Sequence, residues 1–184
     1  MNEIIDIVRD AVGNVSKDLE IIYHHDGADK VLSDIDVSFI FGSAQYVKDV
    51  LDIYTKSDKT DHKFPMIALF TPIEEERGLE RFMSKAKVSI IIACSSTEYF
   101  TNEEREVYSF KNILRPIYRR LLEVLKSDSR LDFGYGDKVQ HIYSENFDYG
   151  RYGAYTASGD AVSEHIDAIN IRSLELNIKY PNCR

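Results

Sequence analysis

The longest regular pattern of apolar residues in this chain covers residues 101–127. Apolar side chains recur there every three or four residues: Val107, Phe110, Leu114, Ile117, Leu121 and Val124. This spacing predicts one amphipathic helix. Thr101 and Glu104 have the spacing of a capping box and predict where the helix begins. Pro116 lies inside the pattern and lacks an N–H group, so we expect a kink there. So broad an apolar face predicts a sheet beneath the helix.

Shorter apolar runs predict the strands and the other helices. Strands are expected at residues 19–24, 36–41, 64–70, 88–94 and 141–147. Helical spacing predicts two further helices, residues 3–12 closed by Gly13 and residues 44–55 capped by Ser43. The run 88–94 is apolar on both faces, so we expect it at the centre of the sheet, under the long helix.

The stretch 166–179 alternates apolar and polar residues, but the alternation changes phase in its middle. Its apolar positions are odd-numbered at first and even-numbered later: Ile169, Ile171, Leu174, Leu176 and Ile178. Successive side chains of a strand point to opposite faces, so one continuous buried face requires an extra residue. We therefore predict a β-bulge or strong bend at Arg172 and Ser173.

The order of the predicted elements indicates the fold class. Helices and strands do not alternate regularly, which argues against a doubly wound sheet. We expect an α+β fold, with a mostly antiparallel sheet packed against the long kinked helix and shorter helices. The length of 184 residues fits a single domain, residues 1–184. Two regions lack a clear pattern, and we expect loop excursions at about residues 72–87 and 128–160.

The charge balance limits the possible partners. The chain has 31 acidic and 23 basic residues and a net charge of −8, which argues against tight binding of nucleic acid. A local basic patch at Arg115, Arg119 and Arg120 remains compatible with this balance. No apolar run approaches the roughly 18 residues that cross a bilayer, so no membrane contact is expected. The two cysteines, without a signal peptide, favour a reducing interior.

One group of carboxylates invites a comparison with nucleotidyltransferases. These enzymes place two carboxylates after a Gly-Ser turn to hold Mg²⁺ ions. Here Asp34 and Asp36 precede Gly42 and Ser43. Asp49 and Asp52 follow, three residues apart on a predicted helix. The order differs, so we interpret these residues as a solvated turn and a helix cap.

Histidines and a cysteine are the other candidates for chemistry. His24, His25 and Asp26 could supply metal ligands, but neighbouring residues of a strand point to opposite faces. Cys94 could be a nucleophile at a strand end, but no glycine-flanked elbow surrounds it, and a small core residue fits better. We predict no catalytic residue, no metal site and no cofactor, and we expect the protein not to be an enzyme.

The two expected excursions supply the candidates for a subunit or partner interface. These residues are Glu74, Glu75, Glu76, Tyr149, Tyr152 and Tyr155. Aromatic, glycine-rich loops suit contacts between proteins. The alternatives are that the tyrosines pack the far end of the core and that the glutamates form a solvated loop.

Four stretches of the chain carry a resemblance to a known family. They are KFPMIALF (63–70), VSIIIACSS (88–96), TNEEREVYSFKNILRPIYRRLLEVL (101–125) and DAINIRSLELNIK (167–179). Together they resemble the tail-terminator, tail-completion and neck proteins of tailed bacteriophages, which are small α+β proteins that form a ring where the tail meets the head. The similarity lies in the order and character of the elements, and the region 135–160 has no counterpart.

The resemblance implies a structural protein of the virion, assembled in the host cytoplasm. It would form a homo-oligomeric ring, a hexamer by the resemblance, between the tail tube protein and the head–tail connector proteins. DNA would pass through the lumen, and an acidic wall would repel it rather than bind it. The alternatives are a metal-dependent or nucleotidyl-transfer-like enzyme and a cytosolic adaptor that binds a partner protein through the tyrosine-rich loops.

Overall fold

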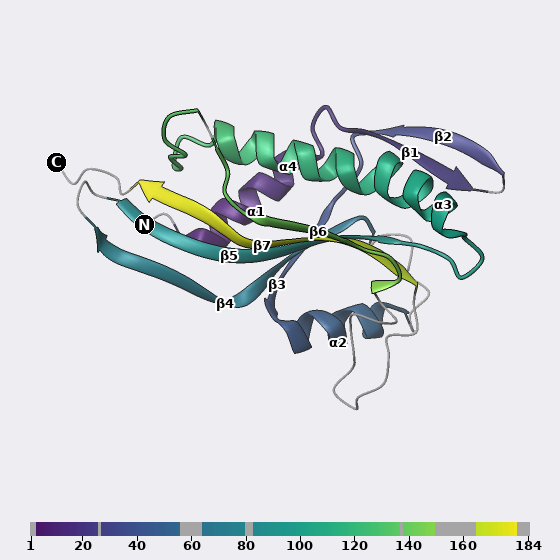
Figure 1. Cartoon of the computed structure of the whole chain (residues 1–184), viewed down its shortest axis with the longest axis horizontal. Helices are drawn as coiled ribbons and strands as arrows, with labels where there is room; N and C mark the ends of the chain where they lie inside the picture. The colour runs from purple at the N-terminus through teal and green to yellow at the C-terminus, as the bar shows by residue number, and fades with distance from the viewer. Residues whose placement is uncertain are drawn as a thin grey trace.

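The structure, a computed structural model, describes residues 3–25, 27–55, 64–79, 83–136, 138–149 and 165–179. Its centre is a five-stranded sheet in the order β3-β4-β5-β7-β6 (Figure 1). The strands are β3 (Ser38–Ser43), β4 (Met66–Leu79), β5 (Met83–Ser95), β6 (Ile142–Asn146) and β7 (Ile166–Lys179). The last described strand in chain order, β7, therefore lies between β5 and β6.

A β-hairpin and the helices surround this sheet. The hairpin consists of β1 (Glu20–His25) and β2 (Ala28–Ser33), and the second of these strands was not predicted. The shorter helices are α1 (Ile4–Val15) and α2 (Ala44–Thr55). α1 continues past Gly13, where we expected its end, because Val15 is fully buried at the far end. Within the described residues, no helix has the length and apolar character that would let it cross a membrane.

The sheet is mixed rather than mostly antiparallel, which corrects our expectation. β3 and β4 run parallel, because α2 connects them as a crossover helix. The pairs β4–β5, β5–β7 and β7–β6 are antiparallel. The coarser prediction, a domain that combines helices with a sheet, is confirmed.

Helices cover both faces of the sheet. α1 and the long helix lie on one face and α2 on the other (Figure 1). In β5, Ile90 and Ile92 contribute to the larger core under the long helix, whereas Ile91 and Ala93 contribute to the smaller core with α2. This explains the strand's apolar character on both faces and confirms its predicted central position.

The long helix has three parts: α3 (Asn102–Arg105), a π-helix η2 (Glu106–Leu114) and α4 (Arg115–Ser127). The predicted capping box is present, since the Glu104 N–H donates to Thr101 Oγ1 and the Thr101 N–H donates to a Glu104 carboxylate oxygen. The wider π-helical turns shift the buried face, so Val107 is 39 % exposed instead of contributing to the predicted stripe. The π-helix ends just before Pro116. In a regular α-helix, the ring of Pro116 would collide with the carbonyl group of the residue four positions earlier. The kink itself stays a prediction.

The predicted bulge in β7 is confirmed. Two residues of β7, Arg172 and Ser173, lie opposite one residue of β5, Ser89, and Ser173 has a φ of 52°. The bulge returns the apolar residues on both sides of it to the same core: Ile169, Ile171, Leu174, Leu176 and Ile178.

The loop excursion expected at residues 72–87 is wrong. β4 runs on to Leu79 and β5 begins at Met83, so both strands continue as a long hairpin. Cross-strand pairing accounts for the polar sequence, because Glu74 lies opposite Lys87 and Glu76 opposite Lys85. In the second expected excursion, β6 agrees with the strand predicted at 141–147, and residues 150–164 lie outside the described residues.

Candidate functional site

A cleft lies between the β1–β2 hairpin, the end of β5 and the long helix. It consists of two adjoining cavities of about 450 and 630 Å³, and Tyr23, His25, Ser95 and Ile113 line both of them. The first cavity is also lined by hydroxyl and aromatic groups: Ser96, Thr97, Phe100, Tyr108 and Ser109. The second cavity is also lined mainly by apolar groups: Ile21, Leu32, Ile35, Phe64, Pro65 and Cys94. One carboxylate, Asp36, lies at the second cavity.

The hairpin presents two histidines to this cleft. His24 stacks on Tyr108, with ring centroids 4.0 Å apart and an interplanar angle of 6°. Its Nδ1 lies 2.7 Å from Asp29 Oδ1 of β2. Both His24 and His25 line the first cavity, although they alternate along β1. Within the described ranges, no group of three His, Cys, Asp or Glu side chains could hold a metal ion.

A buried ion pair lies beneath the cleft and joins the long helix to the sheet. Arg105 Nη1 donates to Asp167 Oδ1 at 2.8 Å, and these residues are 5 % and 0 % exposed. The Ser109 hydroxyl donates to the other carboxylate oxygen at 2.6 Å. Arg105 also donates to Ser96 Oγ at 3.0 Å and to the Thr97 carbonyl at 2.8 Å. The pair therefore fixes the start of the long helix to the ends of β5 and β7.

The network continues from Asp167 to the segment that follows β6. The Asp148 N–H donates to Asp167 Oδ1 at 2.8 Å, and Asp148 Oδ1 lies 2.8 Å from His165 Nδ1. The His165 carbonyl accepts from the Ser96 N–H at 2.8 Å. We name the residues joined by these bonds the polar lock: Ser96, Arg105, Ser109, Asp148, His165 and Asp167.

Cys94 is a core residue beside the polar lock. It is 2 % exposed, and it lies opposite Asp167 in the pairing of β5 with β7. Burial, with a contribution from the negative charge of Asp167, raises the pKa of the Cys94 thiol, although the neighbouring Ser109 hydroxyl and the charge of Arg105 lower it in part. A protonated thiol is a poor nucleophile, so the expectation of a small core cysteine is confirmed.

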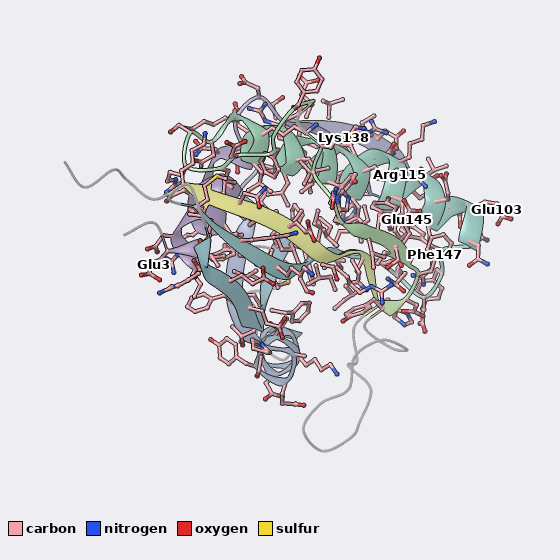
Figure 2. All side chains as sticks on the ribbon, turned by 60° about the vertical axis from the view of Figure 1, so that its left-hand side comes forward. Glu3, Glu103, Arg115, Lys138, Glu145 and Phe147 are labelled. Carbon is pink, nitrogen blue, oxygen red and sulfur yellow. The ribbon has the colours of Figure 1, made fainter. Side chains whose placement is uncertain are left out.

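A second charged cluster connects the long helix to β6. Arg115 donates to both carboxylate oxygens of Glu145, at 2.8 and 3.0 Å, and to Glu106 Oε1 at 2.6 Å (Figure 2). Hydrogen bonds to Glu145 and then Glu106 raise the pKa of Arg115, and the guanidinium group lowers the pKa of Glu145. The Tyr143 hydroxyl also donates to Glu145. The pKa of Tyr143 is raised, mainly because the side chain is partly buried.

The structure separates the residues that we proposed for an interface. Glu74 and Glu76 are exposed on the β4–β5 hairpin, whereas the Glu75 side chain is only 15 % exposed and pairs with Arg77 at 2.8 Å. Tyr149 packs against the smaller core with α2, and burial raises its pKa. Tyr152 and Tyr155 lie outside the described residues. The described members of the two excursions therefore do not form one surface.

The other polar candidates have local structural roles. Ser43 caps α2 as predicted, since its Oγ accepts from the Tyr46 N–H at 3.1 Å. A Cβ at Gly42 would lie 2.5 Å from Tyr46 Cδ1, so the glycine allows this ring to approach the backbone. Asp34, with a φ of 52°, belongs to the bend after β2.

Sequence reasoning missed the polar lock. Arg105 and Asp167 are 62 residues apart, and no local motif connects them. One signal was available, because Asp167 interrupts an apolar strand between Ile166 and Ala168, and a carboxylate there requires a buried partner. Comparison of the chain with family models and with curated proteins finds no match.

Proposed function

We propose that this chain is a structural subunit of the head–tail junction of a tailed bacteriophage, where copies form a ring between the tail tube and the connector. One observation carries the proposal. The four stretches that resemble the tail-terminator and neck proteins lie together as one packed unit. Three of them belong to the neighbouring strands β4, β5 and β7, and the fourth is the long helix, which packs against β5 and β7.

The bonding of the reactive side chains also supports a structural role. Arg105 and Asp167 bond to each other and to neighbouring backbone and hydroxyl groups. The raised pKa of Cys94 keeps its thiol protonated. These groups stabilise the junction of helix and sheet, which fits a structural subunit.

The charge of the chain fits a ring around DNA. A net charge of −8 at pH 7 repels phosphates over a screening length of about 10 Å. A channel wall of this sign would let DNA pass without holding it. The sixfold symmetry of the ring comes from the resemblance.

The experiment that tests the proposal combines a gene deletion with imaging. We expect a phage that lacks this gene to make tails of uncontrolled length, or tails that do not join heads, and we expect the wild-type gene supplied in trans to restore normal particles. Cryo-electron microscopy of the intact virion should show density for the protein at the junction. Normal infectious particles from the deletion strain, or a virion without this density, would refute the proposal.

A second candidate function is that of an adaptor, and the cleft is the observation that favours it. Aromatic and hydroxyl groups line its first cavity, which suits an extended segment of a partner protein. Tyr108→Ala removes the ring that stacks on His24. If the adaptor role is correct, this variant should lose a partner that copurifies with the wild-type protein from infected cells. The junction role instead predicts that Tyr108→Ala still assembles into particles.

A further inference from the structure

In the described ranges of the chain, each outer strand of the sheet has a neighbouring strand on one side only. β3 pairs only with β4, and β6 pairs only with β7, in the part of the chain that the structure describes. Every second residue of an edge strand directs its N–H and C=O groups away from the sheet. β3 has six residues and β6 has five, so the two edges are of similar length.

Three features that commonly prevent pairing with another chain are missing from β3 and β6. Edge strands of monomeric proteins are commonly protected by lysine, proline or a bulge. The sequences of β3 (SFIFGS) and β6 (IYSEN) contain no lysine and no proline, and their pairings with β4 and β7 show no register shift. The one charged residue, Glu145, is neutralised by Arg115.

Large apolar side chains are exposed at both edges. Phe41 on β3 is 41 % exposed, and Ile142 and Tyr143 on β6 are 52 % and 39 % exposed. Phe41 stacks with Phe39, which packs against the larger core. Tyr143 lies against Tyr118 of α4, with ring centroids 4.9 Å apart. Phe41 and Tyr143 therefore both lie on the face of the sheet that the long helix covers.

The strand directions make the two edges complementary. β3 is parallel to β4, and each of the next three steps across the sheet, β4 to β5 to β7 to β6, reverses the direction. β6 therefore runs opposite to β3. If a second copy continues the sheet in the same orientation, its β3 meets β6 of the first copy as an antiparallel neighbour.

We propose that copies of this chain join edge to edge, with β6 of one copy paired antiparallel to β3 of the next. The contact joins two different surfaces, so it leaves one open edge at each end of a growing assembly and can close into a ring. Main-chain hydrogen bonds supply the pairing, and the exposed apolar side chains of the two edges bury one another. This inference rests on the proposed ring, and it names the surfaces that form it.

Paired cysteines test this contact. In a Cys183→Ser background, Phe41→Cys and Tyr143→Cys are made singly and together, and a short bifunctional thiol crosslinker allows for an offset in register. Cys94 is buried, at 2 % exposure, and is not expected to react. Val31→Cys combined with Tyr143→Cys is the control, because Val31 is exposed (60 %) on the hairpin and not on the five-stranded sheet.

The contact between different edges gives a distinctive pattern. The double variant should form a ladder of covalent oligomers that ends at one closed species. An equal mixture of the two single variants should give dimers only, and each single variant alone, like the Val31 control, should give no ladder. Efficient dimerisation of Tyr143→Cys alone would overturn the proposal in favour of β6 pairing with β6.

Native mass spectrometry separates failure of this contact from failure of the ring. Rings without crosslinking in the double variant would refute the edge contact and leave the ring intact. A chain that stays monomeric and uncrosslinked at all concentrations would refute both. If the cysteine variants do not fold, Ile142→Lys provides an independent test. It should abolish the ring species while the thermal midpoint stays within a few degrees of wild type, whereas Val31→Lys should keep the rings.

Discussion

Removal of the buried carboxylate of Asp167 should destabilise the protein severely. In Asp167→Ala, Arg105 keeps its bonds to Ser96 Oγ and to the Thr97 carbonyl but has no counter-charge, although it is only 5 % exposed. Loss of one partner of a buried ion pair costs about 3–5 kcal/mol. The Ser109 hydroxyl also loses its acceptor. A domain of this size has about 5–15 kcal/mol of stability in total, so the variant should be only marginally folded.

The assay is urea denaturation followed by circular dichroism, with the free energy of unfolding extrapolated to water. Glu123→Ala is the control, because Glu123 is 66 % exposed and lies 3.5 Å from Arg120 in a surface pair. Its loss should cost less than about 0.5 kcal/mol. A double variant, Arg105→Met with Asp167→Leu, should recover most of the stability that Asp167→Ala loses, because it leaves no unpaired charge.

Two results would contradict this reasoning. A loss below about 1 kcal/mol in Asp167→Ala, close to that of a surface pair, would mean that water reaches the guanidinium group. Failure of the double variant to recover any stability would mean that the charge pair itself is required, beyond the cost of leaving one partner unpaired.

Four further predictions concern the helix, the bulge, the charges and DNA. Phe110→Ala should lower the free energy of unfolding, measured in urea, by about 3–5 kcal/mol. Val107→Ala, at an exposed position, should change it by less than about 0.5 kcal/mol. Equal losses would contradict the orientation that the π-helix gives these two residues. Ser173→Val should lower the thermal midpoint and Ser173→Gly should not, because Ser173 has a φ of 52°; a tolerated valine would refute the bulge geometry. Arg115 lowers the pKa of Glu145 below its usual value of 4.5. The stability from this pair is therefore present above about pH 4.5 and is lost as the pH falls through the folded-state pKa. Glu145→Gln should reduce that loss of stability in acid, and an unchanged pH profile of stability would contradict the prediction. Mobility-shift assays at physiological salt should show no binding of duplex DNA, and micromolar, salt-sensitive binding would overturn the charge argument.

Local signals in the sequence predicted the local features of the fold. The spacing of Thr101 and Glu104 predicted the capping box, and the hydroxyl of Ser43 predicted the start of α2. The change of phase at Arg172 and Ser173 predicted the bulge. Each of these features depends on residues within a few positions of one another, so the sequence pattern reflects the physical cause directly.

Features that depend on distant partners could not be predicted in this way. The extension of β4 to Leu79 depends on its pairing with β5, which the polar run in the sequence does not indicate. The π-helix that exposes Val107 changes the period on which the helical prediction depended. The partner of Arg105 comes from β7, and only the completed sheet brings Asp167 beside it. The cleft likewise depends on the placement of the hairpin, which no pattern in the chain encodes.

The position of β7 has a consequence for how the chain acquires its structure during synthesis. β7 follows all the other described strands in the chain, yet it pairs on one side with β5 and on the other with β6. Until the ribosome has released it, β6 has no neighbour, β5 is an exposed apolar edge, and the guanidinium group of Arg105 lacks its counter-charge. The nascent chain is therefore open to aggregation and to chaperone binding until β7 is inserted. A premature stop before residue 166 would remove the strand that joins β6 to β5, so it should produce an unfolded chain that proteases remove, rather than a shortened subunit.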